Sequence, residues 1–318
     1  MKKILVITGG SVKKLEQFRE AIQKLKTKSQ ASLMLDVTLA SFSQLEFFSA
    51  EKKGEFILRV GGKDVAEFNV VYIRLVGKRL EDASLLIEYA KQKTLRLRSG
   101  QGIRLVDKVY QDASFLPSTI SKAMELKKLI EAGIRIPKTL FGGIKVIETK
   151  GEELLGFPFI IKGTQGRKSR EAWAPNTHEE LEKMAVALKE EEKQGKRFFA
   201  QKFIEGAQRT RILVVGGRVL GAITRPTKWR TRFLPKIDGQ YPEPEKGQVK
   251  PVPKEDAEIA LAATRAVSLD IAGVDIIHND ATGRPYILEV NAAPRWEAFK
   301  KDTGIQVEEE ILKFLAKL

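Results

Sequence analysis

The chain has 318 residues, and its 56 lysines and arginines against 41 acidic residues give a formal net charge of +15. It contains no cysteine and only two histidines, which excludes disulfides and cysteine nucleophiles and argues against thiolate or histidine-rich zinc sites. No apolar run approaches the roughly 20 residues of a membrane span, so we expect a cytoplasmic protein without a membrane partner. The length predicts two or three packed units, and the charge favours anionic partners such as nucleotides, nucleic acid, ribosomes or acidic peptides.

The first predicted unit, residues 1–115, is a small α/β layer. A strand at Lys3–Thr8 is followed by the turn Gly9-Gly10-Ser11 and an amphipathic helix. The two glycines lack the GxGxxG spacing of a dinucleotide site, so we expect a structural turn. A second buried strand is predicted at Val70–Leu75, where Arg74 either faces an active site or caps the sheet.

The second predicted unit, residues 116–197, combines a helix at Ser121–Ala132 with a strand at Phe159–Lys162 and the glycine loop Gly163-Thr164-Gln165-Gly166. Another strand near Trp173 and an acid-rich helix follow. Glycines let backbone amides approach phosphate oxygens, and Lys162 at the strand end can place its ammonium on the same phosphates. The Walker pattern is absent, and an exposed lysine on a β-hairpin explains this segment equally well.

The third predicted unit, residues 198–318, begins with a strand at Phe198–Ile204 and a hairpin from Ile212 to Ile223. An irregular basic stretch from Arg225 to Lys250 precedes a helix at Lys254–Leu269. The chain then reaches two apolar strands that carry acidic residues, and it closes with a helix.

Those two apolar strands, Gly273–Ile277 and Tyr286–Asn291, contain polar residues of the kinds that bind metal ions, and a tight turn joins the strands. Side chains alternate along a strand, so Glu289 and Asn291 share a face that an antiparallel neighbour can supply with Asp275. Two carboxylates and an amide oxygen suit Mg²⁺. The alternative is that the acids are edge-strand residues paired with nearby arginines, Arg284 or Arg295.

The order of these features resembles the ATP-grasp superfamily, especially its alpha-L-glutamate ligase branch. The order runs from a helical lysine, Lys122, through Lys162 with its glycine loop and the strand Ala200–Ile204 to Asp275, Glu289 and Asn291. The similarity covers about residues 118–318, and it is closest in the glycine loop, in Ala272–Ile276 and from Leu288 to Ile305.

The resemblance implies an α/β (α+β) ATP-grasp fold with a small N-terminal α/β pre-grasp domain at 1–115, a central subdomain at 116–197 and a C-terminal subdomain at 198–318. Lys122 and Lys162 would hold ATP phosphates, and the glycine loop would close over them. Asp275, Glu289 and Asn291 would bind Mg²⁺, with Mn²⁺ as the alternative ion. The full set implied for nucleotide binding is Lys122, Lys162, Gly163, Thr164, Gln165, Gly166 and the hinge Gln201, Lys202, Phe203 and Ile204 with Glu205.

The basic stretch carries Arg225, Lys228, Arg230, Arg232 and Lys236 before its first acid. By the same resemblance, Arg225 and Arg230 would act with Lys162 in catalysis, near the transferring phosphate or the carboxylate substrate, because a guanidinium binds such oxygens bidentately. The alternative is a cationic loop that binds anions non-specifically, and we expect this for Lys236.

The chain departs from the family pattern at three places. Arg209 stands where related sequences carry the acid that takes the ribose hydroxyls, so that contact is in doubt unless Glu205 replaces it. Lys202 occupies a hinge position where an acid is common. Arg295 and Trp296 replace residues typical of the glutamate-ligase branch, which indicates a different acceptor or carboxylate pocket, or a packed core aromatic in the case of Trp296.

We therefore predict an ATP- and Mg²⁺-dependent carboxylate-amine ligase that adds an amino acid, plausibly glutamate, to a peptide or protein. The basic surface would steer the enzyme to an acidic or ribosomal partner. One alternative is a catalytically silent protein of the same fold that binds nucleic acid or the ribosome. Another is a ligase for a small metabolite.

Overall fold

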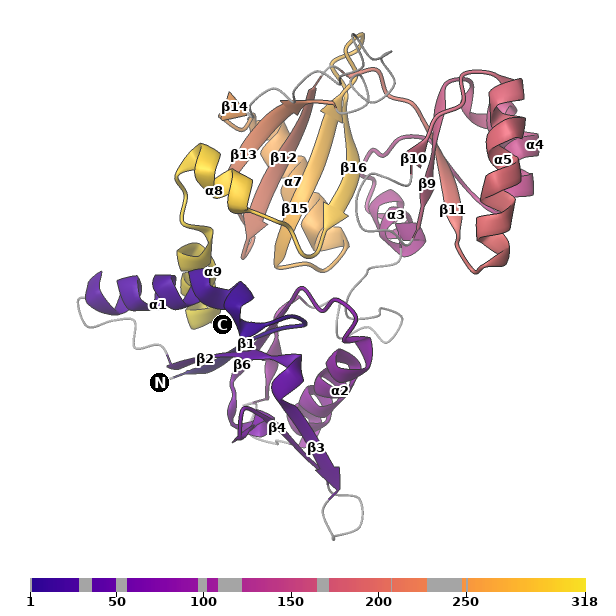
Figure 1. Cartoon of the computed structure of the whole chain (residues 1–318). Coiled ribbons are helices and arrows are strands. Elements are labelled where there is room, and N and C mark those ends of the chain that lie inside the picture. Colours follow the sequence, from indigo (N-terminus) through magenta and orange to yellow (C-terminus); the bar gives the residue numbers. More distant parts are fainter. Residues whose placement is uncertain are drawn as a thin grey trace, which may run out of the picture.

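The computed structural model describes residues 2–28, 36–49, 56–96, 102–107, 122–164, 172–206, 208–227, 248–249 and 251–318. Within these residues the chain forms four β-sheets with helices packed on their faces (Figure 1). The mixed α/β class predicted from the sequence is confirmed. No helix in the described ranges is long and apolar enough to cross a membrane.

The first sheet is parallel, with the strand order β2-β1-β6-β7. Helix α1 packs on one face through Phe18, and helix α2 packs on the other through Leu86. Because both faces are covered, the central strand β1 is apolar on both sides, which accounts for its continuous buried run. The elements are β1 (Lys3–Thr8), α1 (Glu16–Lys28), β2 (Asp36–Ser41), β6 (Val70–Arg74), α2 (Leu80–Arg96) and β7 (Arg104–Leu105).

A second, three-stranded sheet in the order β3-β4-β5 projects from this unit (Figure 1). Its strands are β3 (Leu45–Ser49), β4 (Phe56–Val60) and β5 (Lys63–Asp64), and short 3-10 helices lie at Val12–Leu15, Phe42–Gln44 and Val65–Glu67.

The central sheet is antiparallel, with the order β10-β9-β11-β8, and α4 and α5 cover one of its faces. Side-chain alternation in β9 and β11 sends Ile161 and Ala200 toward these helices and leaves Lys162 and Gln201 on the opposite face. The elements are α3 (Lys122–Glu131), β8 (Thr139–Phe141), α4 (Ile144–Leu155), β9 (Phe159–Gly163), β10 (Ala172–Trp173), α5 (His178–Lys193) and β11 (Phe198–Lys202).

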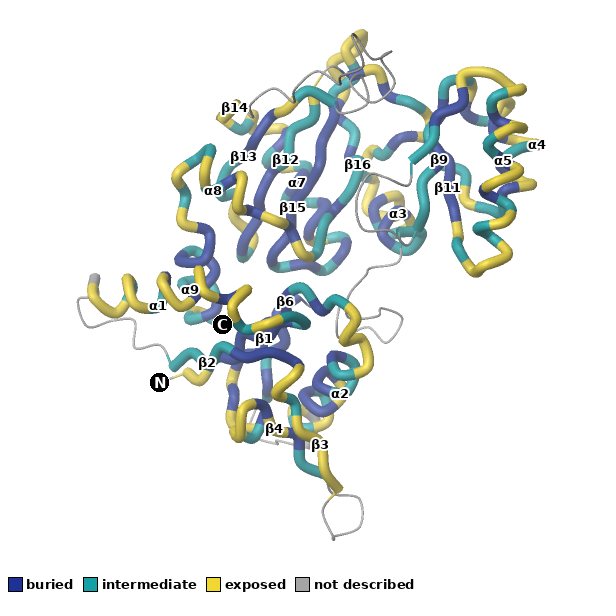
Figure 2. Tube along the Cα trace, viewed as in Figure 1, coloured by how far each residue is buried: buried dark blue, intermediate teal, exposed yellow. Residues whose placement is uncertain are grey.

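The C-terminal sheet has the order β14-β13-β12-β15-β16, and its pairs are antiparallel. Its strands are β12 (Gln208–Val215), β13 (Arg218–Pro226), β14 (Gln248–Val249), β15 (Ile271–His278) and β16 (Pro285–Asn291). The helices are α7 (Lys254–Ala266), α8 (Glu297–Thr303) and α9 (Val307–Lys317). Figure 2 shows how deeply β12 and β15 are buried at the centre of this sheet.

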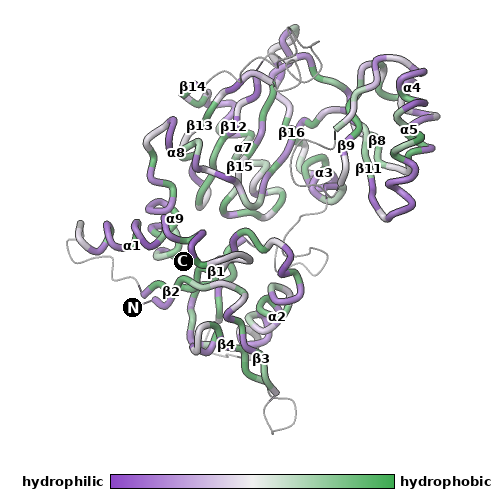
Figure 3. The backbone as a smooth tube through the Cα atoms, in the orientation of Figure 1, coloured by the Kyte–Doolittle hydropathy of each residue, from purple (hydrophilic) through white to green (hydrophobic). Residues whose placement is uncertain are grey.

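The two faces of the C-terminal sheet differ in chemistry. One face presents Ile212, Val274 and Ile287 to α7 and is mainly apolar. On the other face, Leu213 and Ile271 pack against α8 and α9, whereas the far ends of the same strands carry charged residues. In Figure 3 these strands are mainly green, with purple segments that mark the charged positions. Helix α9 also packs on α1 of the first unit, so the two ends of the chain share one core.

Candidate nucleotide and metal site

The acidic strand pair forms as the sequence predicts. Asp275 and Glu289 are opposite one another in the antiparallel ladder of β15 and β16, and Asn291 lies opposite Gly273. A register shift directly after Asp275 leaves one extra residue in β16. This bulge lets Ile287 and Val290, although three residues apart, both enter the α7 core. Asp275, Glu289 and Asn291 therefore share the other face, which looks toward the central sheet.

Asp275 is only 1% exposed, and an arginine holds it. Arg211 is its neighbour across the ladder on β12, and the Nε and NH2 atoms of Arg211 donate to the two Asp275 oxygens at 2.6 and 2.7 Å. Arg209 adds a second cation at 3.6 Å. The hydrogen bonds to Asp275 raise the pKa of Arg211 above its ordinary value, despite the opposing effect of burial. The alternative prediction that Arg284 or Arg295 pairs with this acid was wrong.

Glu289 belongs to a second charged group, which ties helix α3 to β16. The ammonium of Lys122 donates to both Glu289 and Glu125, and Glu125 is 2% exposed and accepts the backbone N–H of Val290 at 2.8 Å. Burial raises the pKa of Glu125. Burial also acts to raise the pKa of Glu289, but Lys122, Lys162 and Arg211 together hold it below its usual range. Glu289 is therefore ionised, and Glu125 fixes the cation that faces it.

Lys162 lies on the face of the central sheet that looks toward these acids. Its ammonium donates to the Gln201 side-chain oxygen at 2.7 Å. Burial lowers the pKa of Lys162 to about 8, with Lys122 and Arg209 acting in the same direction and Glu289 opposing them. The mutual effect of Lys162 and Glu289 on their pKa values indicates that the two side chains lie near one another.

Gln201 is held by a short chain of hydrogen bonds. Its Nε2 donates to the Thr139 hydroxyl at 2.9 Å, and that hydroxyl donates to the Pro137 carbonyl at 2.7 Å. A hydroxyl has one proton to give, so Thr139 must accept from Gln201, and the Gln201 oxygen must face Lys162. The sequence predicted that the backbone of Gln201 belongs to the adenine hinge, and the Gln201 side chain contacts Lys162, the predicted phosphate ligand.

The remaining predicted nucleotide residues surround this region. Gly163 ends β9, and the Thr164 N–H donates to the Arg197 carbonyl at 2.8 Å. Gln201 and Lys202 are the last two residues of β11, the other hinge residues follow it, and the Glu205 carbonyl accepts the Asp280 N–H at 2.7 Å. Gln165 and Gly166 lie outside the described residues. The nucleotide roles of Lys122, Lys162, Gly163, Thr164, Gln201, Lys202, Phe203, Ile204 and Glu205 stay predictions.

Arg225 lies beside Arg209 in the ladder of β12 and β13, and its NH2 donates to Asp302 of α8 at 2.9 Å. Arg209, Arg211 and Arg225 thus lie near one another on the same face of this sheet. Arg230, the second predicted catalytic arginine, lies outside the described residues, as do Lys228, Arg232 and Lys236.

Trp296 is a packed core aromatic, as one of the two interpretations of the sequence expected. It is 1% exposed, and its indole N–H donates to Glu308 at 2.7 Å. The guanidinium of Arg74 stacks 3.5 Å from its ring centroid. Trp296 therefore lines no open pocket, and Arg74 joins the first sheet to the C-terminal unit.

The donor set fits a hard divalent cation. It consists of two carboxylates and the side-chain amide of Asn291, whose oxygen would serve as the third ligand. A cluster of three or more acidic, histidine or cysteine ligands is absent from the part of the chain that the structure describes, so the amide is needed as a third ligand. Oxygen-only sets of this kind suit Mg²⁺ or Mn²⁺ and disfavour zinc.

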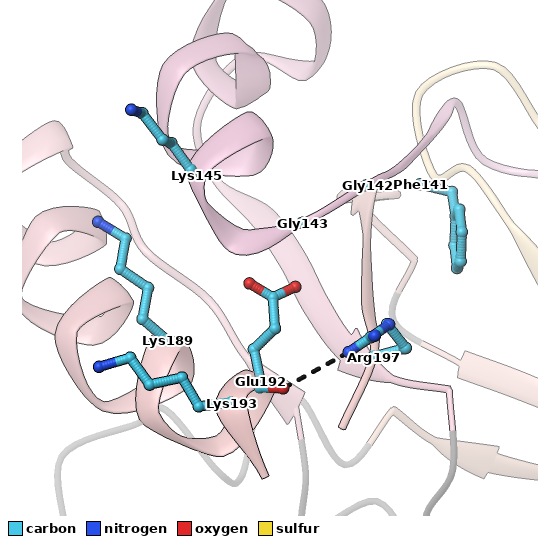
Figure 4. A pocket seen from close by; sticks show the side chains of 8 residues that line it. All are labelled: Phe141, Gly142, Gly143, Lys145, Lys189, Glu192, Lys193 and Arg197. Carbon is cyan, nitrogen blue, oxygen red and sulfur yellow. Dashed lines mark hydrogen bonds between the residues drawn. The ribbon is translucent and has the colours of Figure 1, made fainter. Parts of the chain in front are cut away.

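A separate hollow of about 780 Å³ lies between α4 and α5 (Figure 4). None of the predicted site residues lines it. Several of its charged side chains have partners: Lys189 binds Glu148, Lys193 binds Glu190, and Glu192 accepts the N–H of Ile144. This hollow is therefore distinct from the charged region between the two sheets.

The model of a protein family described as a RimK-like ATP-grasp domain matches residues 119–315. A probable alpha-L-glutamate ligase of Trichodesmium erythraeum is 30% identical over 196 residues, which cover 60% of this chain and 62% of that protein. A ribosomal protein bS6--L-glutamate ligase of Escherichia coli is 28% identical over 200 residues, which cover 61% of this chain and 62% of that protein. The chain thus spans less than two thirds of these curated relatives.

Solved structures resemble the whole chain. The ATP-grasp ligase PsnB, complexed with a phosphomimetic variant of its minimal precursor, Mg and ADP, matches with a TM-score of 0.68 and 15% identity over 99% of this chain and 98% of that one. A RiPP-associated ATP-grasp ligase of Chryseobacterium gregarium, in complex with ADP and a leader and core peptide, matches with a TM-score of 0.67 and 17% identity over 100% and 97% of the two chains. At these identities the likeness concerns the fold.

Proposed function

The chain belongs to the RimK-like ATP-grasp family, and from this premise we propose that it is an ATP-dependent ligase that joins a carboxylate to an amine. The observation that carries the proposal is the meeting of two sets of side chains between the central and C-terminal sheets. One set consists of the oxygen ligands Asp275, Glu289 and Asn291. The other consists of the cations Lys122 and Lys162, which face them from α3 and β9.

This arrangement supports the binding of a nucleoside triphosphate together with a divalent cation. Lys162 and Lys122 would neutralise phosphate oxygens, and Glu289 and Asn291 would hold Mg²⁺ or Mn²⁺ together with Asp275. The cation, when bound, supplies charge neutralisation on the transferring phosphoryl group. In this arrangement electrostatic stabilisation and positioning would carry the catalysis.

The proposed reaction has two steps. A substrate carboxylate oxygen attacks the γ-phosphorus of ATP, the bond to the β-phosphate oxygen breaks, and ADP leaves an acyl phosphate behind. An amine nitrogen then attacks the acyl carbon, the carbon–oxygen bond breaks, and phosphate leaves while the nitrogen loses a proton to solvent. Arg225 is suited to hold the substrate carboxylate or the acyl phosphate, because an arginine fork fits carboxylate and phosphate oxygens. Arg230 stays a sequence prediction for this role.

The proposed substrates are an amino acid, plausibly glutamate, and a peptide or protein acceptor. Support comes from the relatives named above, one of which acts on a ribosomal protein. The net charge of +15 favours an acidic acceptor through long-range attraction. A cytoplasmic location agrees with these substrates and with the absence of cysteine.

One observation favours a second candidate function. Arg209, which lies beside Asp275, occupies the position at which the family pattern has a ribose-binding acid. The loss of that acid would weaken the nucleotide contact, which would suit a silent protein that binds nucleic acid or the ribosome through its basic surface.

A screen of ADP release separates the candidates. The protein is incubated with ATP and Mg²⁺ and with each amino acid in turn, with and without acidic peptides. We expect ADP release that requires both an amino acid and a peptide. Release with amino acids alone would indicate a small-metabolite ligase. RNA binding without any release would refute the ligase and favour the silent protein.

A further inference from the structure

One predicted cation ligand is already engaged by the protein itself. Both oxygens of Asp275 accept hydrogen bonds from the fork of Arg211, at 2.6 and 2.7 Å, and the carboxylate is 1% exposed. The ladder between β12 and β15 fixes the backbones of the two residues opposite each other. A cation can therefore reach Asp275 only after the Arg211 side chain has turned away.

The side chain of Arg211 has room to turn, whereas that of Asp275 does not. Arg211 is 37% exposed on the cleft face, and Asp275 is enclosed between its neighbours. Glu289 differs from Asp275, because it binds Lys122 through one oxygen and is 36% exposed.

The charges of the region oppose a bare cation. The described side chains that face one another here are four cations, Lys122, Lys162, Arg209 and Arg211, and three acids, Glu125, Asp275 and Glu289. A divalent cation alone would add positive charge to a region that already has an excess of it. A nucleoside triphosphate brings negative charge that offsets this excess. Its phosphate oxygens also offer the Arg211 fork a replacement for the Asp275 carboxylate.

We propose that Arg211 excludes a divalent cation from the nucleotide-free enzyme and releases Asp275 to it only when nucleotide phosphates arrive. The proposal rests on the proposed function, since it concerns the order in which that site is filled. The consequence is that cation and nucleotide enter together, so the acids never hold a cation without its phosphate partner. The coupling is reciprocal, because each ligand strengthens the binding of the other.

The test measures Mn²⁺ binding by electron paramagnetic resonance, with and without a non-hydrolysable ATP analogue. The wild-type protein should bind Mn²⁺ at least tenfold more tightly with the analogue than without it. Arg211→Met should bind Mn²⁺ at least tenfold more tightly than wild type in the absence of the analogue, because Asp275 is then free. Arg218→Met, which removes an exposed arginine of β13 that pairs with Glu310, is the matched control and should behave as wild type.

Arg211→Lys and Asp275→Asn keep the proposal testable if Arg211→Met does not fold. The lysine variant retains the charge but loses the fork, so its Mn²⁺ affinity without the analogue should rise. Asp275→Asn should weaken Mn²⁺ binding only when the analogue is present. Equal Mn²⁺ affinity in the wild type and both Arg211 variants without analogue would overturn the proposal while leaving the ligase intact. Failure of the wild type to bind the analogue at all would instead count against the proposed function.

Discussion

Two buried aspartates, one within strand β15 and one that contacts its start, have opposite surroundings. Asp275, in the middle of β15, is surrounded by Arg211 and Arg209. Asp107, which follows β7, docks on the start of β15, where its Oδ1 accepts the N–H groups of Asp270 and Ile271 at 2.7 and 2.9 Å. Burial raises the pKa of Asp107 to about 7.

The comparison teaches that burial of an acid does not by itself indicate a binding site. Asp107 has a left-handed backbone with φ of 64°, its carboxylate accepts backbone N–H groups, and its own N–H donates to Asp270, so its role is to join the first unit to the C-terminal sheet. Asp275 has cations, a second carboxylate opposite it and an amide two residues further along. Only the second environment has the composition of a site for a cation and phosphates.

The largest effect should follow from removing the oxygen ligands. Glu289→Gln combined with Asn291→Ala should lower ADP formation by about a thousandfold or more, because the charge on the transferring phosphoryl group is no longer neutralised. Asp107→Asn, which changes the other buried acid, should retain turnover. Circular dichroism would check that the double variant is folded, and turnover within tenfold of wild type would refute the assigned site.

The next largest effect concerns stability at the charged face. Arg211→Met leaves Asp275 buried beside only the more distant Arg209, which should lower the free energy of unfolding by about 3 kcal/mol. Urea denaturation of the single variant and of Arg211→Met/Asp275→Leu measures this. The double variant should recover most of the loss, since the uncompensated charge is gone, and a loss that persists undiminished would mean that the pair is not coupled.

Asp107 should make the free energy of unfolding fall as the pH rises, whereas an ion-paired acid would make it rise. Its pKa is raised in the folded state, from 3.8 to about 7, so the folded protein binds more protons than the unfolded chain between these values. Stability contributed by Asp107 is therefore full below about pH 4 and declines as the pH rises to 7, by about 2 kcal/mol between pH 5 and 7.5. Asp107→Asn should abolish this part of the decline in urea melts at the two pH values. Parallel declines in both proteins would show that other groups cause it.

The smallest effect concerns Lys162. Its pKa of about 8 predicts that kcat/KM for ATP falls as the pH rises above 8, since the neutral amine no longer attracts phosphate. Gln201→Met removes the acceptor of the ammonium and should move this break to lower pH, whereas Gln201→Glu should move it higher. Breaks that shift in the same direction in both variants would refute the positioning role of Gln201.

Local patterns allowed much of this molecule to be predicted. The strand at Val70–Arg74 and the acidic strand pair follow from apolar runs and alternation, which depend on neighbouring residues. Helix α4 was not predicted, because its β-branched residues and Gly151 have weak helix propensity. Gly151 lies against Phe159 of β9, where a Cβ would come within 2.8 Å of the ring, so tertiary packing explains this residue.

The partners of the site residues could not be predicted, because they are distant in sequence. Arg211 and Asp275 are 64 residues apart, and Lys122 and Glu289 are 167 residues apart. Only the ladder of β12 with β15 and the docking of α3 on β16 bring them together. Glu125 was not singled out from the sequence, and its burial against Val290 emerges only once helix α3 is placed. The signal available for Arg211 was a basic residue within an apolar strand.

The most direct test of the central claim follows one oxygen atom. The carboxylate substrate found in the ADP screen is labelled with ¹⁸O, and the phosphate released during amide formation is analysed by mass spectrometry. Activation through an acyl phosphate predicts that one labelled oxygen is transferred to each phosphate, and that Glu289→Gln with Asn291→Ala abolishes the transfer. Amide formation accompanied by unlabelled phosphate would contradict the account.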